Sequence, residues 1–422
     1  MLITMSPAQL RGTACAPASK SEAHRRMICA GLTAEETTLT GFMVSADMRA
    51  TGDCLRALGT GLDREGDILR VRGFAHKPAL LPVYDCGESG STLRFFVPIA
   101  LAMTHGGIFR LHGRLGQRPM DVYRDLFVPR GVMWRMGEGA DGTAELTVAG
   151  AIQPGEYVLP GDVSSQFVSG LLFALPLLEG ESVLTVRPPV ESAAYIRMTV
   201  KALADSGVRL EELSPWSWRI PGMQRYHARG GQLHGDWSQA AVLLCMGALG
   251  QDVTVSGLST DTVQGDVAVL RHLRALGAQI EEDESGIRVT RGTPRAAVLD
   301  LRDEPDIAPI LALVCQLAPG ESRLTGCGRL RLKECDRLAA TVELLNDLGG
   351  CCRAEGDDIV ITGVERLRGG RVRPYHDHRM VMLASAAALC SEGPVTVEDA
   401  EALDKSWPQY LEVYRALGGD AR

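Results

Sequence analysis

The chain has 422 residues, 45% of them hydrophobic, and this length predicts two or three domains with large cores. Its 44 basic and 52 acidic residues give a net charge of −8, which argues against non-specific binding to nucleic acid or to an anionic membrane. The 11 cysteines form no Cys-x-x-Cys pair. This pattern favours reduced, buried thiols in a cytoplasmic protein, and we expect no signal peptide and no membrane span.

Six amphipathic segments recur along the chain, each followed by a glycine, the usual residue for a left-handed helix end. The segments are 47–58, 119–130, 193–206, 263–276, 334–348 and 406–417. The glycines that follow them are Gly59, Gly131, Gly207, Gly277, Gly349 and Gly418. Because these glycines are 69 to 76 residues apart, we predict six copies of one structural unit.

A second helix series is interleaved with the first and is apolar around its whole circumference, which predicts buried helices. Its segments are 23–32, 92–103, 166–178, 239–249, 307–317 and 380–390. Short alternating stretches such as 67–71 and 287–290 read as strands. The predicted fold is therefore α/β, and each unit contains a strand, a buried helix, a strand, an amphipathic helix and a further strand or hairpin.

Six units of this size fit two domains of three units each, with the buried helices inside. The polar, Gly-rich stretch 225–234 predicts the boundary. The first strand, residues 2–8, precedes the first unit, and we expect it to belong with the C-terminal half. The predicted domains are residues 1–18 with 235–422, and residues 19–234 inserted between them.

Residues 85–94 read Asp-Cys-Gly-Glu-Ser-Gly-Ser-Thr-Leu-Arg and join a short strand to a buried helix. Such a helix start offers bare N–H groups and a partial positive charge to an anion. Gly90 lets a ligand approach the backbone, and Arg94 can reach back one turn. An ordinary serine cap is the alternative, and the lack of a following Gly-Lys-Ser/Thr excludes a Walker loop.

Cations gather at the predicted starts of both helix series. Each alone is typical of a solvated cap or a local ion pair. Together they predict a cleft with positive potential between two domains, and a small, strongly anionic substrate with phosphate and carboxylate groups. They are Lys20, Arg25, Arg94, Arg118, Lys333, Arg337, Arg379 and Lys405.

Uncharged and acidic residues stand at the same places. The run Ser164-Ser165-Gln166 suits a phosphate as well as a simple helix cap, and Asp47 reads as a cap. Asp306 precedes an apolar helix, so it is a candidate general base or a cap. No Cys/His cluster has metal-ligand spacing and no Gly-x-Gly-x-x-Gly follows a strand. We therefore expect acid–base chemistry without a metal or a cofactor.

These motifs in combination resemble the 5-enolpyruvylshikimate-3-phosphate synthase (3-phosphoshikimate 1-carboxyvinyltransferase) family over almost the whole chain. They are Ser19-Lys20-Ser21 with His24-Arg25, Gly87 to Arg94, Arg118-Pro119, Ser164-Ser165-Gln166, Gln264-Gly265-Asp266, Lys333-Glu334 with Arg337, Asp377-His378-Arg379-Met380, and Lys405-Ser406. The resemblance implies two inside-out α/β domains of three βαβαββ units each, which close over an active site in the cleft between them. It also implies a cytoplasmic monomer.

The resemblance implies transfer of the enolpyruvyl group of phosphoenolpyruvate to the 5-hydroxyl of shikimate 3-phosphate, with release of phosphate, on the pathway to chorismate and aromatic amino acids. The residues implied for shikimate 3-phosphate are Lys20, Ser21, Arg25, Ser164, Ser165, Gln166, Ser192, Asp306 and Lys333. Those implied for phosphoenolpyruvate are Lys20, Gly90, Arg118, Gln166, Arg337, Arg379 and Lys405. Asp306 would take the proton of the 5-hydroxyl. Glu334 is the favoured donor of a proton to the methylene carbon, with Lys20 and Lys405 as alternatives.

The chain departs from the family pattern in its glycine loop. Glu88 stands where many members have Asn, and Ser91 replaces the usual Thr but keeps the hydroxyl. Glu88 adds a negative charge near the implied phosphoenolpyruvate site. Gly90 keeps the small residue that leaves room for the inhibitor glyphosate in the family, so we expect sensitivity to it.

Two other functions remain open from the sequence. The sister enzyme that acts on UDP-N-acetylglucosamine has a cysteine in the loop before the Arg-Pro pair, and residues 111–118 contain none. The other alternative is a non-catalytic, anion-binding scaffold. Such a scaffold would not need the carboxylates of Asp306 and Glu334 beside the cations.

Overall fold

The structure, a computed structural model, describes residues 1–74, 81–227 and 229–422. The chain forms two compact units, which we call unit 1 (residues 1–19 and 234–422) and unit 2 (residues 20–233). Position 228, in the stretch that the sequence predicts as the boundary, lies outside the described residues. None of the helices in the described part of the chain combines the length and the apolar character needed to cross a membrane.

One motif builds the sheets, and residues 83–149 of unit 2 contain it in full. It runs through β6 (Val83–Asp85), α3 (Gly90–Met103), β7 (Gly106–Leu111), α4 (Asp121–Phe127), β8 (Met133–Glu138) and β9 (Ala144–Ala149). Strands β6 and β7 are parallel, and β9 pairs antiparallel with both β7 and β8, which gives the order β6-β7-β9-β8. This is the βαβαββ unit that the family resemblance implies, so the predicted fold class is confirmed.

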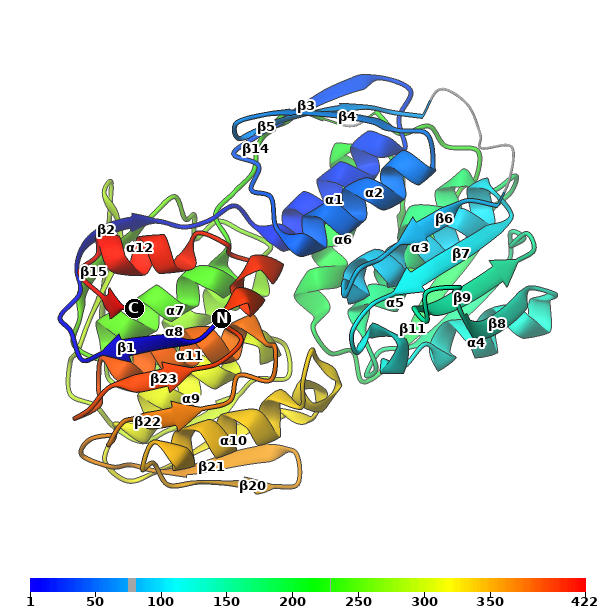
Figure 1. The fold of residues 1–422 in the computed structure, drawn as a ribbon. Coiled ribbons are helices and arrows are strands. Elements are labelled where there is room, and N and C mark those ends of the chain that lie inside the picture. The colour runs from blue at the N-terminus through cyan, green and yellow to red at the C-terminus, as the bar shows by residue number, and fades with distance from the viewer. Residues whose placement is uncertain (75–80, 228) are drawn as a thin grey trace. The chain divides into compact units, whose positions relative to one another are not determined.

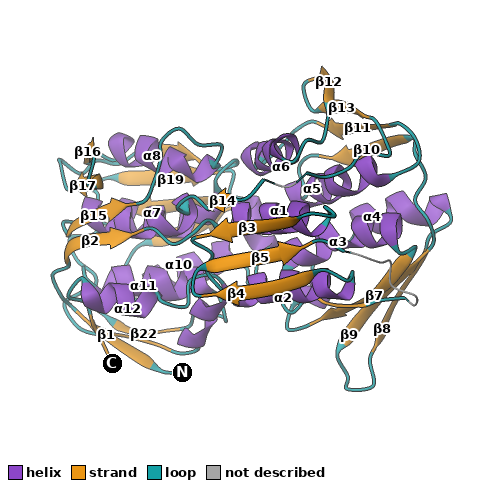
Figure 2. Ribbon diagram, turned by 90° about the horizontal axis from the view of Figure 1, so that it is seen from above, coloured by secondary structure: helices purple, strands orange, loops and turns teal. Residues whose placement is uncertain are grey.

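Two further copies complete unit 2, and their sheets have the orders β10-β11-β13-β12 and β14-β3-β5-β4. The first copy contains β10 (Glu156–Pro160), α5 (Ser165–Ala174), β11 (Ser182–Arg187), α6 (Ala193–Asp205), β12 (Glu211–Ser214) and β13 (Ser217–Ile220). The second contains α1 (Lys20–Gly31), β3 (Glu36–Thr40), α2 (Ala46–Ala57), β4 (Gly61–Glu65), β5 (Ile68–Arg72) and β14 (Gly231–Gln232). Figure 2 shows β3, β5 and β4 side by side, with α1 and α2 lying against them.

Unit 1 contains three copies of the same motif. The first consists of β2 (Arg11–Cys15), α7 (Trp237–Ala248), β15 (Asp252–Ser256), α8 (Val269–Ala275), β16 (Gln279–Asp283) and β17 (Gly286–Thr290). The second consists of β18 (Val298–Asp300), α9 (Ala308–Gln316), β19 (Glu321–Thr325), α10 (Arg337–Asp347), β20 (Cys352–Glu355) and β21 (Asp358–Thr362). The third consists of β22 (Gly370–Val372), α11 (His378–Ala388), β23 (Val395–Val397), α12 (Tyr410–Ala416), β24 (Asp420–Ala421) and β1 (Ile3–Ser6).

The two N-terminal strands complete sheets that are otherwise built from the C-terminal half of the chain. Strand β1 pairs antiparallel with β23 and β24, and β2 pairs parallel with β15. The expected association of the first strand with the C-terminal half is therefore confirmed.

The apolar helices form the core of each unit, as their composition predicts. Every residue of α7, α9 and α11 is buried, and Figure 1 shows these helices running among the strands of unit 1. In unit 2, α3 packs on α5, and only Ser91, Ala102 and Gln166 of the two helices are not buried. Each fully buried Leu or Phe contributes about 1.5–3 kcal/mol, so these helices are a main source of stability.

The glycine repeat is confirmed, because all six glycines that follow the amphipathic helices have φ between 75° and 102°. The starts of these helices are less regular than the sequence predicts. Helix α10 begins at Arg337 rather than at position 334, because the Asp336 side chain caps it by accepting a hydrogen bond from the backbone N–H of Ala339 at 3.0 Å. Helix α4 likewise begins at Asp121, two residues beyond Pro119.

The last amphipathic helix also begins later than predicted. Lys405 does not open it but ends the 3₁₀ turn η7 (Ala400–Lys405), and α12 starts at Tyr410. Pro408 accounts for the gap, because a proline disfavours helical backbone at the residue before it.

Candidate active site

Lys20 is the first residue of α1, and Asp47 in the first turn of α2 holds its ammonium group. Lys20 Nζ lies 2.8 Å from Asp47 Oδ2, and the two side chains are 19% and 8% exposed. The cap of α2 is Ser45, whose hydroxyl accepts from the backbone N–H of Met48. Asp47 is thus an ion-pair partner and not the cap that the sequence suggests.

Arg25, one turn further along α1, is buried, and each of its three guanidinium nitrogens donates a hydrogen bond. Its Nε donates to Thr199 Oγ1 at 2.8 Å, and its two terminal nitrogens donate to the carbonyls of Ser21 and Tyr195. Burial lowers the pKa of Arg25 to about 10, so the side chain is still a cation at neutral pH. Ser192, which is also buried, stands at the start of α6 with φ of 51°. These contacts bring the starts of α1 and α6 together.

Helices α3 and α5 meet through a polar bridge at their N-terminal ends. Gln166 Oε1 accepts from Arg94 Nη1 at 2.7 Å, and Gln166 Nε2 donates to Ser91 Oγ at 2.8 Å. The amide orientation follows from the chemistry, because a guanidinium only donates. Ser164 caps α5 and Ser165 begins it, and both are buried. The predicted Ser-Ser-Gln run is therefore part of a structured helix start.

Gly90 opens α3 directly beside the guanidinium of Arg118. A Cβ built at Gly90 would lie 2.7 Å from Arg118 Nη1, so a side chain here would require the guanidinium to move. Arg118 follows the 3₁₀ turn η1 (Leu115–Gln117) and is not at the start of α4. The carbonyl of the next residue, Pro119, accepts a hydrogen bond from Arg94 Nη2 at 3.1 Å. The absence of a side chain at Gly90 thus permits this close approach.

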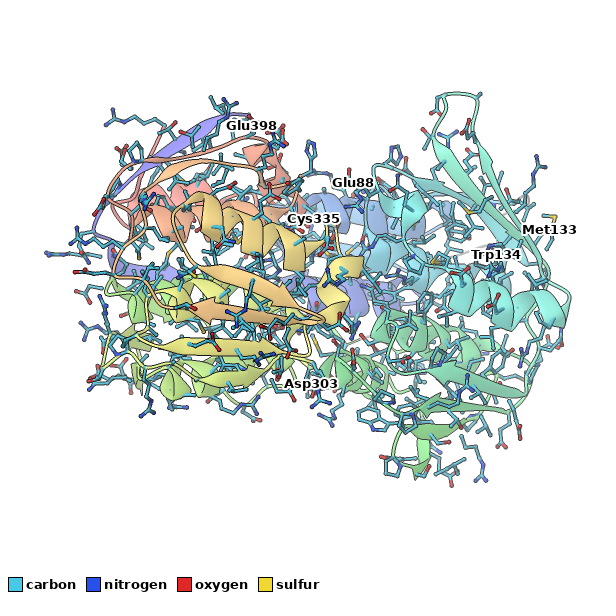
Figure 3. All side chains as sticks on the ribbon, turned by 90° about the horizontal axis from the view of Figure 1, so that it is seen from below. Glu88, Met133, Trp134, Asp303, Cys335 and Glu398 are labelled. Atoms are coloured by element: carbon cyan, nitrogen blue, oxygen red, sulfur yellow. The ribbon has the colours of Figure 1, made fainter. Side chains whose placement is uncertain are left out.

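Glu88, the departure in the glycine loop, lies at the surface of unit 2 (Figure 3). Its carboxylate lies against Gly113, in the segment that leads to Arg118. The charge of Glu88 is therefore well solvated, which reduces its influence on neighbouring groups.

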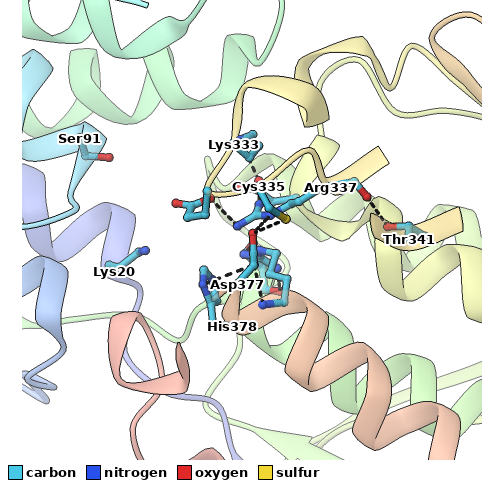
Figure 4. Close-up of polar contacts among 12 residues, drawn as sticks. Lys20, Ser91, Lys333, Cys335, Arg337, Thr341, Asp377 and His378 are labelled. Carbon is cyan, nitrogen blue, oxygen red and sulfur yellow. Dashed lines mark hydrogen bonds and ion pairs between the residues drawn. The ribbon is translucent and has the colours of Figure 1, made fainter. Parts of the chain in front are cut away.

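In unit 1, Asp306 lies beside two cations that the sequence places in the same site, Lys333 and Arg337, both of which Figure 4 labels. It belongs to the 3₁₀ turn η5 (Pro305–Ile307) before α9, and its Oδ1 lies 2.8 Å from Lys333 Nζ and 2.9 Å from Arg337 Nη1. Burial on its own would raise the pKa of Asp306. The charges of Lys333, Arg379 and Arg337 outweigh that effect and hold the pKa well below its usual value. Asp306 is therefore ionised.

Arg337 is the centre of this cluster and is only 2% exposed. Besides Asp306 it contacts Glu334 through Nη2 at 2.6 Å and Asp377 through Nε at 2.7 Å. Burial alone would lower the pKa of Arg337, but the three carboxylates raise it well above its usual value. Three negative charges around one buried cation hold the guanidinium in a fixed orientation.

Asp377 also belongs to this site, although the sequence analysis names it only as part of a motif and predicts no role for it. It caps α11 and accepts from Arg379 N at 2.9 Å and from Cys335 Sγ at 3.5 Å, in addition to Arg337. The side chain of Arg379 turns away to the carbonyl and hydroxyl of Ser238 on α7. The sequence signal for Asp377 was its place directly before the His378-Arg379 motif. Lys405 is buried at the end of η7, which packs on α11.

The described residues contain no group of three or more His, Cys, Asp or Glu side chains that could hold a metal ion. The structure places most of the candidates at or near helix starts, whereas Arg118, Lys333 and Lys405 stand at the ends of 3₁₀ turns. Unit 2 contributes Lys20, Ser21, Arg25, Gly90, Arg118, Ser164, Ser165, Gln166 and Ser192. Unit 1 contributes Asp306, Lys333, Glu334, Arg337, Arg379 and Lys405. Such an arrangement can bind anions through cations and hydroxyls and can move protons through carboxylates.

Two solved structures share this fold. An EPSP synthase from Acinetobacter baumannii superposes with a TM-score of 0.80 at 23% identity, and the match covers 100% of this chain and 99% of that one. An enolpyruvyl transferase from Streptomyces tendae gives a TM-score of 0.80 at 19% identity and covers 100% and 98% of the two chains. At these identities the likeness concerns the fold alone.

Sequence relatives are closer. A 3-phosphoshikimate 1-carboxyvinyltransferase from Clostridium kluyveri is 37% identical over 99% of this chain and 97% of the relative. The enzyme of the same name from Clostridioides difficile is 34% identical over 98% and 96%. The family model described as EPSP synthase (3-phosphoshikimate 1-carboxyvinyltransferase) matches residues 5–414. This protein therefore belongs to the EPSP synthase family.

Proposed function

We propose that the protein transfers the enolpyruvyl group of phosphoenolpyruvate to the 5-hydroxyl of shikimate 3-phosphate and releases phosphate. The observation that carries this proposal is the family match over residues 5–414, together with 37% identity to a named 3-phosphoshikimate 1-carboxyvinyltransferase along nearly the whole chain. The reaction places the protein in the shikimate pathway to chorismate and aromatic amino acids.

The cation clusters of both units fit this pair of substrates. Shikimate 3-phosphate and phosphoenolpyruvate together carry about five negative charges at neutral pH, so they repel each other unless cations hold them. We assign shikimate 3-phosphate to Lys20, Ser21, Arg25, Ser164, Ser165, Gln166, Ser192, Asp306 and Lys333. We assign phosphoenolpyruvate to Lys20, Gly90, Arg118, Gln166, Arg337, Arg379 and Lys405. Clamping both anions orients the hydroxyl towards the enol carbon.

Asp306 is the proposed base for the 5-hydroxyl. Its low pKa depends on Lys333, Arg379 and Arg337, of which Lys333 and Arg337 contact Oδ1. When Lys333 turns to a substrate hydroxyl, Asp306 loses one cation, and its pKa rises towards the ordinary value. Substrate binding thereby makes Asp306 a stronger base at the moment at which it is needed.

Glu334 is the proposed donor of a proton to the methylene carbon, with Lys20 and Lys405 as alternatives. Protonation of that carbon builds positive character next to the carboxylate of phosphoenolpyruvate, and the 5-hydroxyl oxygen then adds to it. The tetrahedral intermediate next loses a proton from its methyl group and expels phosphate, so that atoms and charges balance. Buried carboxylates near the reacting carbon stabilise the developing positive charge.

A continuous assay of phosphate release tests this function. We expect turnover only when phosphoenolpyruvate and shikimate 3-phosphate are both present. Equal turnover with UDP-N-acetylglucosamine as acceptor would replace the assignment by the sister activity. The lack of phosphate release with either acceptor would favour a scaffold that binds anions without catalysis.

Four finer statements belong to the same proposal. We propose domains of residues 1–18 with 235–422 and of residues 19–234, a monomeric state, a cytoplasmic location and inhibition by glyphosate. Limited proteolysis, light scattering, cell fractionation and inhibitor titration test them in that order. A stable dimer in light scattering would contradict the monomer, and full activity at saturating glyphosate would contradict the inhibition.

A further inference from the structure

A buried chain of polar side chains crosses three helices of unit 2. His24 Nδ1 on α1 lies 2.7 Å from Thr51 Oγ1 on α2, and Thr51 Oγ1 lies 2.8 Å from Thr92 Oγ1 on α3. Thr92 Oγ1 then donates to Ser89 Oγ at 2.8 Å. The four side chains belong to residues that are at most 1% exposed. Water therefore does not compete with these bonds.

The direction of every hydrogen in this chain follows from the count of donors. A threonine hydroxyl carries one hydrogen, and that of Thr92 is used on Ser89, so Thr92 must accept from Thr51. Thr51 has then used its own hydrogen and must accept from His24. The ring of His24 is thus protonated at Nδ1, and this hydrogen starts the chain.

The far end of the chain lies at the glycine loop. Ser89 is the N-cap of α3, and its Oγ accepts from both the backbone N–H and the hydroxyl of Thr92. The next residue is Gly90, where an added Cβ would displace Arg118 Nη1. A shift of the cap would therefore change how closely the start of α3 approaches Arg118.

The near end of the chain lies among the other cations of unit 2. His24 precedes Arg25, and both pack on the ring of Phe95 of α3, with the His24 ring edge-on at 6.4 Å and Arg25 Cζ at 5.4 Å from its centre. Thr51 is on α2, one turn beyond Asp47, which holds Lys20. The chain therefore ties together the helices that carry Lys20, Arg25 and Gly90.

We propose that His24, acting through Thr51, Thr92 and Ser89, is a positioning residue that sets Gly90 against Arg118 for phosphoenolpyruvate. The inference rests on the proposed function for the identity of that ligand. Removal of the Thr92 hydroxyl leaves the hydroxyl hydrogen of Thr51 without its acceptor, and it leaves Ser89 Oγ without one of its two donors. Such orphaned buried groups are costly, and the α3 start would shift to relieve them.

Thr92→Val and Thr92→Ser form the test pair. Valine keeps the shape of threonine and lacks the hydroxyl, whereas serine keeps the hydroxyl. We expect Thr92→Val to raise the KM for phosphoenolpyruvate about tenfold, the equivalent of one buried hydrogen bond, with less than about twofold change for shikimate 3-phosphate. Thr92→Ser should have the same KM for phosphoenolpyruvate as the wild-type protein.

Thr60→Val is the matched control, because Thr60 is buried in the same unit and its hydroxyl makes only a 3.5 Å contact with the Gly31 carbonyl. It should leave both KM values unchanged. If Thr92→Val and Thr60→Val behave alike in both KM values, or if Thr92→Val raises both KM values equally, the proposal is overturned.

A second measurement does not depend on the activity. The ¹⁵N NMR spectrum of the His24 ring in the full-length wild-type protein, assigned by its loss in His24→Asn, should report a proton on Nδ1. An Nδ1 without a proton would overturn the proposed direction of the chain, even if the enzyme is active. Absence of wild-type activity with an Nδ1 proton would instead overturn the proposed function and leave the polar chain in place.

Discussion

Asp306 illustrates how neighbouring charges decide what one carboxylate can do. With Lys333 and Arg337 both on Oδ1, the group is ionised and a weak base, although burial alone would favour its neutral form. The same two cations keep it aimed in one direction. In the proposed mechanism, Asp306 becomes available as a base only when the substrate engages one of these cations.

Asp306→Ala should lower kcat by about 10²–10⁴-fold, the usual contribution of a general base, with only a modest change in the KM of either substrate. Asp303→Ala is the control, because this exposed acid lies three residues earlier in the same segment (Figure 3). Steady-state kinetics decide the matter. An unchanged kcat in Asp306→Ala would remove the residue from the mechanism.

Lys20 has a different role, because we assign one ammonium group to both anions. Lys20→Met should weaken the binding of both substrates. Each KM should rise by about tenfold or more, as expected for the loss of a charge-assisted contact. Lys201→Met, which removes an exposed ion pair with Asp205 in the same unit, should have no effect. Loss of affinity for one substrate alone would contradict the shared role.

The pH dependence of stability follows from the lowered pKa of Asp306. A carboxyl whose pKa is lower in the folded than in the unfolded protein stabilises the fold above the unfolded pKa of about 3.9. This contribution is lost as the pH falls through the lower, folded pKa. Asp306→Asn should therefore be less stable than wild type at pH 7, and the two stabilities should converge as the pH falls from the unfolded pKa through the lower, folded pKa. Urea unfolding at a series of pH values measures this, and a gap that widens in acid would refute it.

Among the elements, α10 and α11 are joined at their starts by the bond between Arg337 and Asp377. Both side chains are almost completely buried. Breaking a buried pair by removing one partner leaves an uncompensated charge, whereas removing an exposed pair costs little. The pair thus fixes the start of α10, which Glu334 precedes by three residues, and the first turn of α11, which contains Arg379.

Arg337→Met should destabilise the protein by about 3–5 kcal/mol, because it leaves Asp377 in the core without its cation. The double variant Arg337→Met/Asp377→Asn should recover part of this loss, since the buried charge is gone. Arg353→Met, which breaks the half-exposed pairs of this β20 residue with Glu321 and Glu355, should cost less than about 1 kcal/mol. Urea unfolding gives all three values, and equal losses for Arg337→Met and Arg353→Met would contradict the account.

The elements themselves could be predicted from the sequence, but their partners could not. An all-apolar helix and a glycine after an amphipathic one are local signals, and both were sufficient for the repeat. The pairs Lys20–Asp47 and Arg337–Asp377 join residues 27 and 40 positions apart, and local patterns do not choose between distant partners. One sequence signal was available for the contact of Gln166 with Ser91, because both are polar residues in the first turn of otherwise apolar helices.

Across the whole molecule, the βαβαββ motif places the proposed residues at equivalent positions. Each buried helix begins shortly after a strand that has a parallel partner, and a helix start of this kind can present backbone N–H groups to a ligand. For α1 and α7 that strand, β2 or β14, belongs to a sheet of the other unit. Lys20, Gly90, Ser165, Asp306 and Arg379 stand at or just before the starts of the buried helices. The net charge of −8 describes the whole protein, whereas each copy of the motif provides its own N–H donors and nearby cations. These local groups explain how an acidic protein could bind two anions.

The identity of the product tests the central claim most directly. Mass spectrometry of a reaction run in ²H₂O should detect the carboxyvinyl ether of shikimate 3-phosphate with deuterium in the vinyl group. Deuterium enters because protonation of the methylene carbon creates a methyl group that later loses one of its hydrogens. A product without deuterium would contradict the addition–elimination route, and the absence of any carboxyvinyl ether of shikimate 3-phosphate would contradict the function itself.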